Sequence, residues 1–473
     1  MLLHCACFLI CAALAVAQNL PVPLDQIVKR ESTATAEDRT FQARVLKDNP
    51  IDDIVLRPSK LRAPTLPYFY DIMFDAPCRH TKIKISVDTG SSDFWLDSGV
   101  WCKCDTRKQF PQWCNQVDTF QSKPAPDTLK YDDGHVVKGA FLSKDLIFGD
   151  KNLKNVTFLA AWDYSLNGSP DKTNDWNGLV GLGYLRNQQA QKTDRGKYLT
   201  LPYVLEAQGN TSSNAFSMWF KKTERGKGFE ASILFGGYPK NYYKGDLTVF
   251  KMIKHLTEYR PSEILIRLDR LSFRGVDALT RCKDSLGVLL DTGSYSSWLP
   301  FDTFHALARS LGKYETDSNS NRTFAIFEDC SGWDLTEAVV FQFGNLKIPV
   351  PLSDIVRNVN QEEIESGRFP EIYDSKQCIT HGIAAEPKAK IIARGLQGNP
   401  SDHVYRFILG VTFLRHAFIL YDLPQEEVAL APIKQSALKN KAILTYFDDL
   451  YDHKGQGSYN PVEGVRESCS LTS

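Results

Sequence analysis

The chain has 473 residues, which is long enough for two lobes that bury a large hydrophobic core. Hydrophobic residues make up 42% and charged residues 24% of it, values typical of a globular protein, so the composition excludes a disordered chain. The 56 basic and 56 acidic residues balance, which gives no support to nucleic-acid binding or to an electrostatic membrane anchor.

The N-terminus predicts an export signal. Residues 2–17 form an apolar run that ends in Ala15-Val16-Ala17, the small-x-small pattern of a signal cleavage site. The run is too short to cross a bilayer comfortably. We therefore expect residues 1–17 to be a signal peptide, the protein to be secreted, and no transmembrane span.

Residues 18–66 are polar and dotted with proline, which is typical of a propeptide or N-terminal extension. The dibasic pair Lys29-Arg30 is a candidate processing site, and an ordinary solvated pair is the alternative. The sequence leaves open a mature start near Glu31 or much later.

Cysteine and sequon usage agrees with export. Outside the predicted signal peptide, an even number of cysteines predicts disulfides in a secreted chain. They are Cys78, Cys102, Cys104, Cys114, Cys282, Cys330, Cys378 and Cys469. A metal site on the 102–114 cluster is the alternative, but no second motif or nearby histidine cluster supports it. The glycosylation candidates are Asn155, Asn167, Asn210 and Asn321.

From Tyr68 onward the sequence predicts a mostly β protein, because short runs of Val, Ile, Phe, Tyr and Thr alternate with Gly, Asn and Asp. The predicted strands include 82–87, 135–142, 145–150, 231–237, 263–273 and 339–344. One helix is predicted over 301–314, where apolar residues follow one face. His305 on that face is interpreted as a packed helix residue. A polar C-terminal extension is expected over 433–473.

One acidic turn occurs twice. The nine residues D88-T-G-S-S-D-F-W-L96 return as D291-T-G-S-Y-S-S-W-L299, with six positions identical. Each copy is followed by two apolar residues and a glycine, at Leu179-Val180-Gly181 and Ile408-Leu409-Gly410. Two lobes of similar plan explain this repeat. We place the N-terminal lobe at 67–250 and the C-terminal lobe at 251–432.

The chemistry of the repeat lies in its aspartates. Two carboxylates that face each other cannot both ionise easily, so the pair of Asp88 and Asp291 would hold one proton. The ionised member could take a proton from water while the protonated member donates to a substrate carbonyl, without metal or cofactor. The glycines leave room for close approach, the threonines can brace the two turns, and the serines can bond the carboxylates. These supporting residues are Thr89, Gly90, Ser91, Thr292, Gly293 and Ser294.

These residues carry a family resemblance. The chain resembles the pepsin-like aspartic endopeptidases over nearly all of 66–432, and the loop 102–114, the dibasic region and the ending Y421-D-L-P look most like fungal secreted candidapepsins and yapsins. The landmarks are D88-T-G-S, Y131-D-D-G134, G178-L-V-G-L-G183, F235-G-G237, D291-T-G-S, the cysteines 330 and 378, and I408-L-G with F413-L-R, Y421-D and A431-P.

The resemblance implies a bilobal fold of two pseudo-symmetric β lobes with the active-site cleft between them. It implies a catalytic pair, Asp88 and Asp291, and a β-hairpin flap. In the flap, Tyr131 would close over substrate and hydrogen-bond Trp95, while Asp133-Gly134 would meet the peptide backbone. Trp298 has no flap to meet and is expected in the core.

The resemblance also implies a Cys330–Cys378 disulfide, and Cys114 is expected to pair with Cys102 or Cys104. The implied partners are protein or peptide substrates and pepstatin-like inhibitors, with no cofactor and a monomeric protein. The predicted function is a secreted endopeptidase that prefers apolar or aromatic sites.

Two other functions were weighed. One is a catalytically silent binding or inhibitor-like protein on the same fold, which the retention of both aspartates and the flap tyrosine argues against. The other is a carboxylate-pair glycosidase, which needs no duplicated Asp-Thr-Gly turn.

Overall fold

The structure is a computed structural model. It describes residues 54–56, 74–75, 85–97, 127–148, 151–166, 169–170, 178–189, 198–222, 229–254, 260–279, 285–312, 314–316, 324–359, 364–365, 376–386, 390–394, 403–440, 442 and 444–446. The chain divides into the units Met1–Pro50 and Ile51–Ser473, and the described residues all belong to the second.

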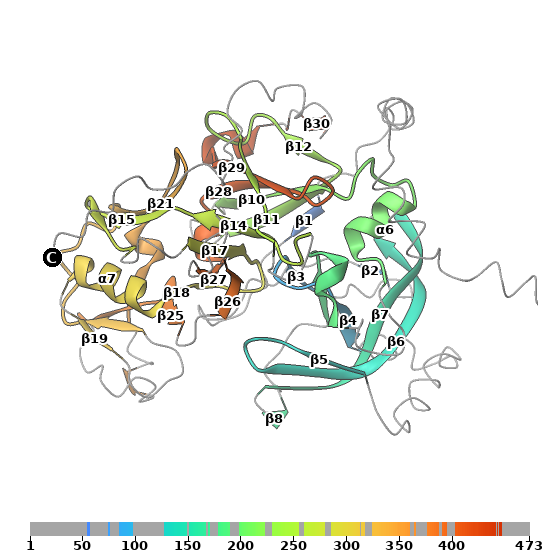
Figure 1. Cartoon of the computed structure of the whole chain (residues 1–473), viewed down its shortest axis with the longest axis horizontal. Coiled ribbons are helices and arrows are strands. Elements are labelled where there is room, and N and C mark those ends of the chain that lie inside the picture. The colour runs from blue at the N-terminus through green and yellow to red at the C-terminus, as the bar shows by residue number, and fades with distance from the viewer. Residues whose placement is uncertain are drawn as a thin grey trace, which may run out of the picture. The chain divides into compact units, whose positions relative to one another are not determined.

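The fold is mostly β, as predicted, and, apart from one two-stranded sheet, the sheets of the described residues fall into three groups (Figure 1). The first group is an eight-stranded sheet from the N-terminal half. Its order is β2 (Phe74–Asp75), β6 (His135–Phe148), β7 (Lys151–Leu166), β4 (Phe94–Asp97), β9 (Gly178–Gly181) and β3 (Ser86–Asp88), with β5 (Asp127–Lys130) on β6 and β8 (Ser169–Pro170) on β7.

The second group comes from the C-terminal half. Its six-stranded sheet contains β14 (Leu265–Leu268), β17 (Ser285–Leu290), β27 (His403–Leu409), β18 (Ser297–Pro300) and β25 (Ile383–Glu386), with β26 (Lys390–Arg394) on β27. One four-stranded sheet has the order β16 (Val276–Asp277), β15 (Arg270–Phe273), β21 (Ala338–Phe343) and β22 (Leu346–Pro351). Another has the order β19 (Tyr314–Thr316), β20 (Ala325–Phe327), β24 (Cys378–Thr380) and β23 (Val356–Asn358).

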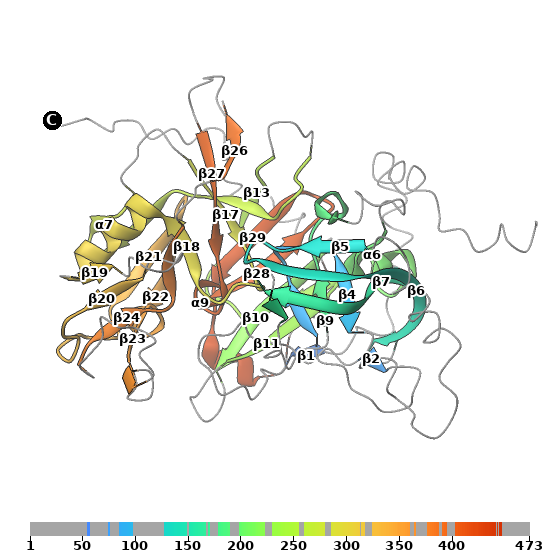
Figure 2. The ribbon, with the colours of Figure 1, turned by 90° about the horizontal axis from the view of Figure 1, so that it is seen from below.

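A central six-stranded sheet takes strands from both halves, and Figures 1 and 2 draw it between the other two groups. Its order is β1 (Ile54–Leu56), β11 (Phe229–Phe235), β10 (Phe216–Lys222), β28 (Ala417–Asp422), β29 (Glu427–Pro432) and β13 (Thr248–Lys251). The contact between β10 and β28 joins the two halves of the chain through backbone hydrogen bonds. The strand β1 lies within the expected N-terminal extension, yet it pairs with β11 over its whole length.

The start of the expected C-terminal extension also packs on the body. The turn η4 (Gln435–Lys439) buries Ala437 and Leu438 against an apolar cluster that includes Trp219. The strand β30 (Leu444–Tyr446) pairs with β12 (Gly237–Pro239).

Three helices and two short turns of helix complete the described elements. They are α6 (Leu201–Ala207), α7 (Phe301–Leu311), η1 (Leu185–Asn187) and η3 (Leu352–Asp354), and a four-residue helix, α9 (Val411–Leu414), follows the second repeated glycine. The helix predicted over 301–314 begins at Phe301 but ends at Leu311, because Gly312 takes an extended conformation and its N–H closes the last turn on Ala308. The interpretation of His305 agrees with the structure, since its ring is buried between Phe301 and Phe304.

The limits of several predicted strands need correction. The run 135–142 and the described part of the run 145–150, which ends at Phe148, lie in the single strand β6, because a register shift between Lys144 and Leu146 absorbs the break in the pattern. Conversely, the run 263–273 divides into β14 and β15 at Asp269. The helix α6 was not predicted, although its proline stands in the first turn, where the missing N–H costs nothing.

The repeated motif has the same topology in both halves. The strand β3 runs parallel to β9, and β17 runs parallel to β27. Each aspartate therefore stands at the C-terminal end of a strand that pairs with an apolar-apolar-glycine strand, Asp88 as its last residue and Asp291 directly after it. Both glycines are required by close packing. A Cβ on Gly181 would lie 2.5 Å from the Ser92 backbone, and one on Gly410 would lie 2.5 Å from the Ser296 carbonyl oxygen. In each half of the chain, the apolar-apolar-glycine strand therefore packs directly against the loop that follows the aspartate.

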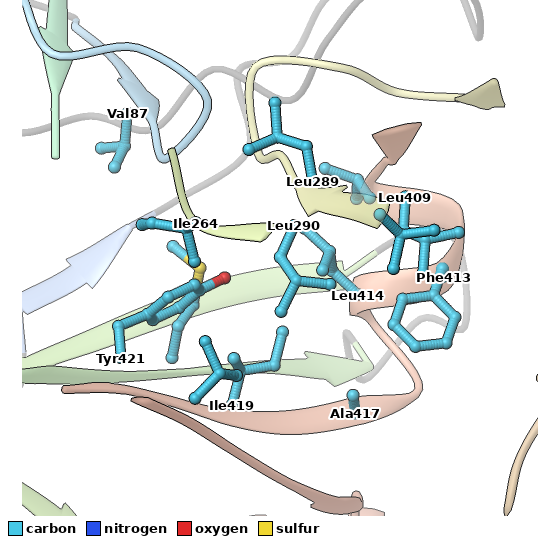
Figure 3. Close-up of a cluster of buried hydrophobic side chains, with 14 of the residues drawn as sticks. Val87, Ile264, Leu289, Leu290, Leu409, Phe413, Leu414, Ala417, Ile419 and Tyr421 are labelled. Atoms are coloured by element: carbon cyan, nitrogen blue, oxygen red, sulfur yellow. The ribbon is translucent and has the colours of Figure 1, made fainter. Parts of the chain in front are cut away.

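Apolar side chains of β3, β9, β17 and β27 belong to one continuous hydrophobic core, part of which Figure 3 shows. It brings Val87 before the first aspartate together with Leu290 before the second, and both are fully buried. One core prediction is wrong: Trp298 is partly exposed, whereas its counterpart Trp95 is buried. The repeat is thus symmetric in backbone and unequal in the surroundings of its tryptophans.

Candidate active site

The two aspartates occupy matching positions in two loops. Asp88 ends β3 and Asp291 follows β17, and both side chains are buried, with 6% and 7% exposure. One Oδ1 accepts the Gly90 N–H and the other accepts the Gly293 N–H, each at 2.8 Å. The outer oxygens are bonded as well. The Ser91 hydroxyl donates to Asp88 Oδ2 at 2.5 Å and the Ser294 hydroxyl donates to Asp291 Oδ2 at 2.6 Å.

The two loops are locked together by their threonines. The backbone N–H of Thr89 donates to the Thr292 hydroxyl, and the N–H of Thr292 donates to the Thr89 hydroxyl, each at 3.1 Å. Each hydroxyl donates onward across the interface, from Thr89 to the Leu290 carbonyl at 2.6 Å and from Thr292 to the Val87 carbonyl at 2.7 Å. These four buried hydrogen bonds fix the separation of the two carboxylates.

The glycines bring the carboxylates into contact with the opposite loop. A Cβ added to Gly90 would lie 2.5 Å from Asp291 Oδ1, and one added to Gly293 would lie 2.7 Å from Asp88 Oδ1. No side chain larger than hydrogen fits at either position without moving an aspartate. The inner oxygens of the pair therefore face each other across the loop interface.

The electrostatics match a shared proton. Burial raises the pKa of Asp88 well above 3.8, and the charge of Asp291 and a hydrogen bond with it raise that pKa further. The Ser91 hydroxyl and the Gly90 N–H oppose this rise. The protonated form of Asp88 is thus favoured, so the pair can present one acid and one base to a substrate.

The predicted flap is a hairpin of β5 and β6. The turn at 131–134 closes through the bonds Tyr131 N–H to the His135 carbonyl, at 2.8 Å, and Gly134 N–H to the Tyr131 carbonyl, at 3.1 Å. Gly134 has φ of 91°, a left-handed conformation that favours glycine. The Asp133 carboxylate caps the turn by accepting the His135 N–H and contacting its ring nitrogen at 2.6 Å.

The flap tyrosine sits beside the predicted partner tryptophan. Tyr131 packs against the apolar cluster that contains Trp95. Burial raises the pKa of Tyr131, as do Asp93 and Asp88, and the Trp95 indole opposes that rise. The Tyr131 hydroxyl is near enough to the indole for this effect, and the hydrogen bond between the two side chains stays a prediction.

Sequence reasoning missed the residues that hold the flap base. The Gln189 side-chain amide exchanges hydrogen bonds with the backbone of Lys130 at the end of β5, accepting its N–H at 2.8 Å and donating to its carbonyl. The backbone N–H of Gln189 donates to Asp93 at 2.6 Å, and the Tyr198 hydroxyl also donates to Asp93. Asp93 lies inside the motif D88-T-G-S-S-D-F-W-L96 and is buried. Its carboxyl directly before the apolar residues Phe94-Trp95-Leu96 was the sequence feature that could have pointed to it.

The role of Tyr421, which stands in the landmark Y421-D, was also not predicted. Its ring is fully buried and stacks on Phe216 with centroids 4.7 Å apart. Burial raises the pKa of Tyr421, a rise that Thr89 opposes and Asp291 adds to. This tyrosine is therefore part of the support of the aspartate loops.

Other predicted sites fall partly outside the described residues. The structure contains the Cys330–Cys378 disulfide, with Cα atoms 6.1 Å apart. Asn155 is exposed on β7 and Asn210 is partly exposed after α6. The predicted sites that lie outside the described residues are Cys78, Cys102, Cys104, Cys114, Cys282, Cys469, Asn167 and Asn321. Among the residues that the structure does describe, no helix is long and apolar enough to cross a bilayer.

The fold and site define a class: a mostly β, bilobal, pepsin-like protein in which two Asp-Thr-Gly loops bring two carboxylates together. A family model described as eukaryotic aspartyl protease matches residues 68–433. Since this match covers most of the chain, the protein belongs to the eukaryotic aspartyl protease family. It is an aspartic-type endopeptidase, a hydrolase, as predicted.

Individual relatives agree with this assignment. Secreted aspartic protease 3 of Candida albicans is 27% identical over 399 residues, which cover 82% of this chain and 85% of the relative. The probable aspartic-type endopeptidase opsB of Aspergillus oryzae is 25% identical over 462 residues, covering 95% of this chain and 84% of the relative. The crystal structure of aspartic proteinase from Irpex lacteus shows the same fold, with a TM-score of 0.56, 14% identity, and coverage of 82% of this chain and 99% of that one.

Proposed function

We propose that this protein is a secreted endopeptidase that hydrolyses peptide bonds through water activated between Asp88 and Asp291. The observation that carries the proposal is the cross-braced pair of loops, which holds two buried carboxylates against each other with matching hydrogen bonds on their outer oxygens. That geometry has no need of a covalent intermediate, because water is the nucleophile and the pair moves its protons.

The proposed roles follow from the raised pKa of Asp88. Asp88 holds the shared proton and donates it to the carbonyl oxygen of the scissile bond. Asp291 accepts a proton from the attacking water. Ser91 and Ser294 keep the outer oxygens bonded, while Tyr131, Asp133 and Gly134 cover the substrate and reduce access of bulk water.

Export and substrate preference are also proposals. The apolar run at 2–17, the disulfide, and relatives named as secreted proteases support secretion. We propose cleavage at apolar or aromatic positions of extended peptides, inhibition by pepstatin, a monomeric protein, and glycans on the exposed Asn155. Peptide-library digestion, size-exclusion chromatography and intact mass before and after deglycosylation test these points directly.

We propose that the mature chain retains β1. The pairing of Ile54–Leu56 with Ala231–Ile233 extends the central sheet, so cleavage beyond Leu56 would remove a paired strand and expose the edge of β11. N-terminal sequencing of the secreted protein should find a start before Ile54. A mature start near residue 66 would contradict this proposal.

The decisive experiment measures hydrolysis of a denatured protein by the purified mature protein from acid to neutral pH, with and without pepstatin. Asp88→Asn and Asp291→Asn should each abolish cleavage. Asp145→Asn is the matched control, because Asp145 pairs with Lys154 on the β6–β7 hairpin and leaves the dyad untouched. Failure of the unaltered protein to cleave at any pH, with no self-processing, would favour the silent binding protein instead.

A further inference from the structure

An arginine from the C-terminal half reaches the tip of the flap. Arg406 lies on β27, two residues before the apolar-apolar-glycine motif. Its Nη1 is 3.2 Å from Asp132 Oδ2 in the flap turn, and its Nε is 2.8 Å from Glu263 Oε1. The bridge joins residues 274 positions apart in the sequence and therefore connects the two halves of the chain at the flap.

The two ends of this bridge differ in exposure. The side chains of Arg406 and Glu263 are only 11% and 10% exposed, whereas that of Asp132 is 59% exposed. Burial acts to lower the pKa of Arg406, but the carboxylates of Glu263 and Asp132 more than offset this, so the group stays charged. Arg406 and Glu263 thus form a fixed buried pair, and Asp132 is the member that can leave.

Glu263 also sets the direction of the guanidinium. It bonds Nε, and the planar fork of arginine then aims the remaining donors in a fixed direction, toward the flap. A lysine could supply the charge but could not hold Glu263 and Asp132 with the same geometry. The base of the flap is held separately within its own half by Gln189, which bonds the backbone of Lys130.

We propose that Arg406 is a positioning residue that latches the flap over the catalytic pair through Asp132, with Glu263 as its buried anchor. The catalytic consequence rests on the proposed function, whereas the latch itself is a property of the fold. A latch with one exposed member is weak: pairs of this kind change a conformational equilibrium by about two- to five-fold and are screened by salt. Such a latch lets the flap open for substrate and favours its return.

The first test measures hydrogen exchange of the backbone amides in 127–139 at low ionic strength. Asp132→Asn should speed exchange there by about two- to five-fold, and high salt should remove the difference from the unaltered protein. Arg406→Gln should do the same, and the double variant should exchange no faster than either single variant, because both substitutions remove one interaction. Asp163→Asn is the control, since its ion pair with Lys138 also lies on a flap strand but stays within one half of the chain.

Arg406→Gln leaves Glu263 buried without its partner, so that variant alone could lose stability for another reason. Asp132→Asn avoids this because the Asp132 side chain is 59% exposed and its replacement leaves Arg406 paired with Glu263. Arg406→Lys completes the set and should recover less than half of the effect on exchange.

The second test measures kinetics on a peptide substrate. Asp132→Asn should raise KM by about two- to five-fold at low salt with a smaller change in kcat, and Asp163→Asn should change neither. Unchanged flap exchange in Asp132→Asn, or an equal increase in Asp163→Asn, would overturn the latch. Absence of hydrolysis in every variant, with the exchange pattern as expected, would refute the proposed function and leave the latch standing.

Discussion

The threonine brace makes a quantitative prediction: Thr292→Val should destabilise the protein much more than Thr292→Ser. Valine has nearly the shape of threonine but lacks the hydroxyl, so packing is kept while two hydrogen bonds disappear. These are the bond to the Val87 carbonyl, at 2.7 Å, and the bond from the Thr89 N–H, at 3.1 Å. The Val87 carbonyl and the Thr89 N–H, which lose their partner, are both buried.

The magnitude follows from the cost of a buried unpaired polar group, about 1–3 kcal/mol. Two such groups give about 2–5 kcal/mol for Thr292→Val, with the carbonyl contributing less because it has two lone pairs. Thr292→Ser retains the hydroxyl and loses one buried methyl group, which costs about 1 kcal/mol. The expected difference between the two variants is therefore about 1–4 kcal/mol.

Urea denaturation of the two variants beside the unaltered protein measures this difference, with equal m-values as the check that the unfolded states are comparable. Hydrolysis by Thr292→Val should also fall, because the separation of the carboxylates is no longer fixed. If Thr292→Val and Thr292→Ser unfold at the same urea concentration, the brace does not stabilise the loops and the reasoning fails.

Three further outcomes are expected. Asp88→Asn should raise the melting temperature at pH 7 and lose that advantage near pH 3.5. The pKa of Asp88 is raised in the fold, so at a pH above about 3.9, where an unfolded aspartate ionises, its ionisation destabilises the folded state. An equal shift in melting temperature at both pH values would contradict this. Gly90→Ala should lower kcat by about 100-fold while the protein stays folded, because the new Cβ displaces the carboxylate of Asp291. Gly332→Ala is the control and should leave activity unchanged, because a Cβ at Gly332 would meet no atom within 4 Å. Replacing both Cys330 and Cys378 by alanine should cost about 4 kcal/mol in denaturation, given their separation of 48 residues, and a loss below about 1 kcal/mol would refute that estimate.

Interactions within one motif were predictable from the sequence, whereas most contacts between distant segments were not. The two aspartates proposed to be catalytic, their glycines and their serines stand in two contiguous motifs, and their hydrogen bonds run to neighbours two or three residues away. Local chemistry of that kind is readable from the sequence. The duplication added the one long-range fact needed, which is that the two motifs meet.

Strand limits were less predictable because they depend on neighbours. A register shift opposite β7 carries β6 through a break in its hydrophobic pattern. The surroundings of Trp298 likewise follow from packing, since Trp298 and Trp95 hold the same place in two motifs that match at six of nine positions, while their exposure differs.

The sequence by itself determined the class of chemistry, because two carboxylates in matching turns have to share a proton once they meet. Only the tertiary structure decided how the flap is held. Gln189 at its base and Arg406 at its tip lie far from the flap in sequence, and neither belongs to a motif that predicts the contact. The pairing of Arg406 with Asp132 exists only because β27 and the flap turn come together in the folded chain.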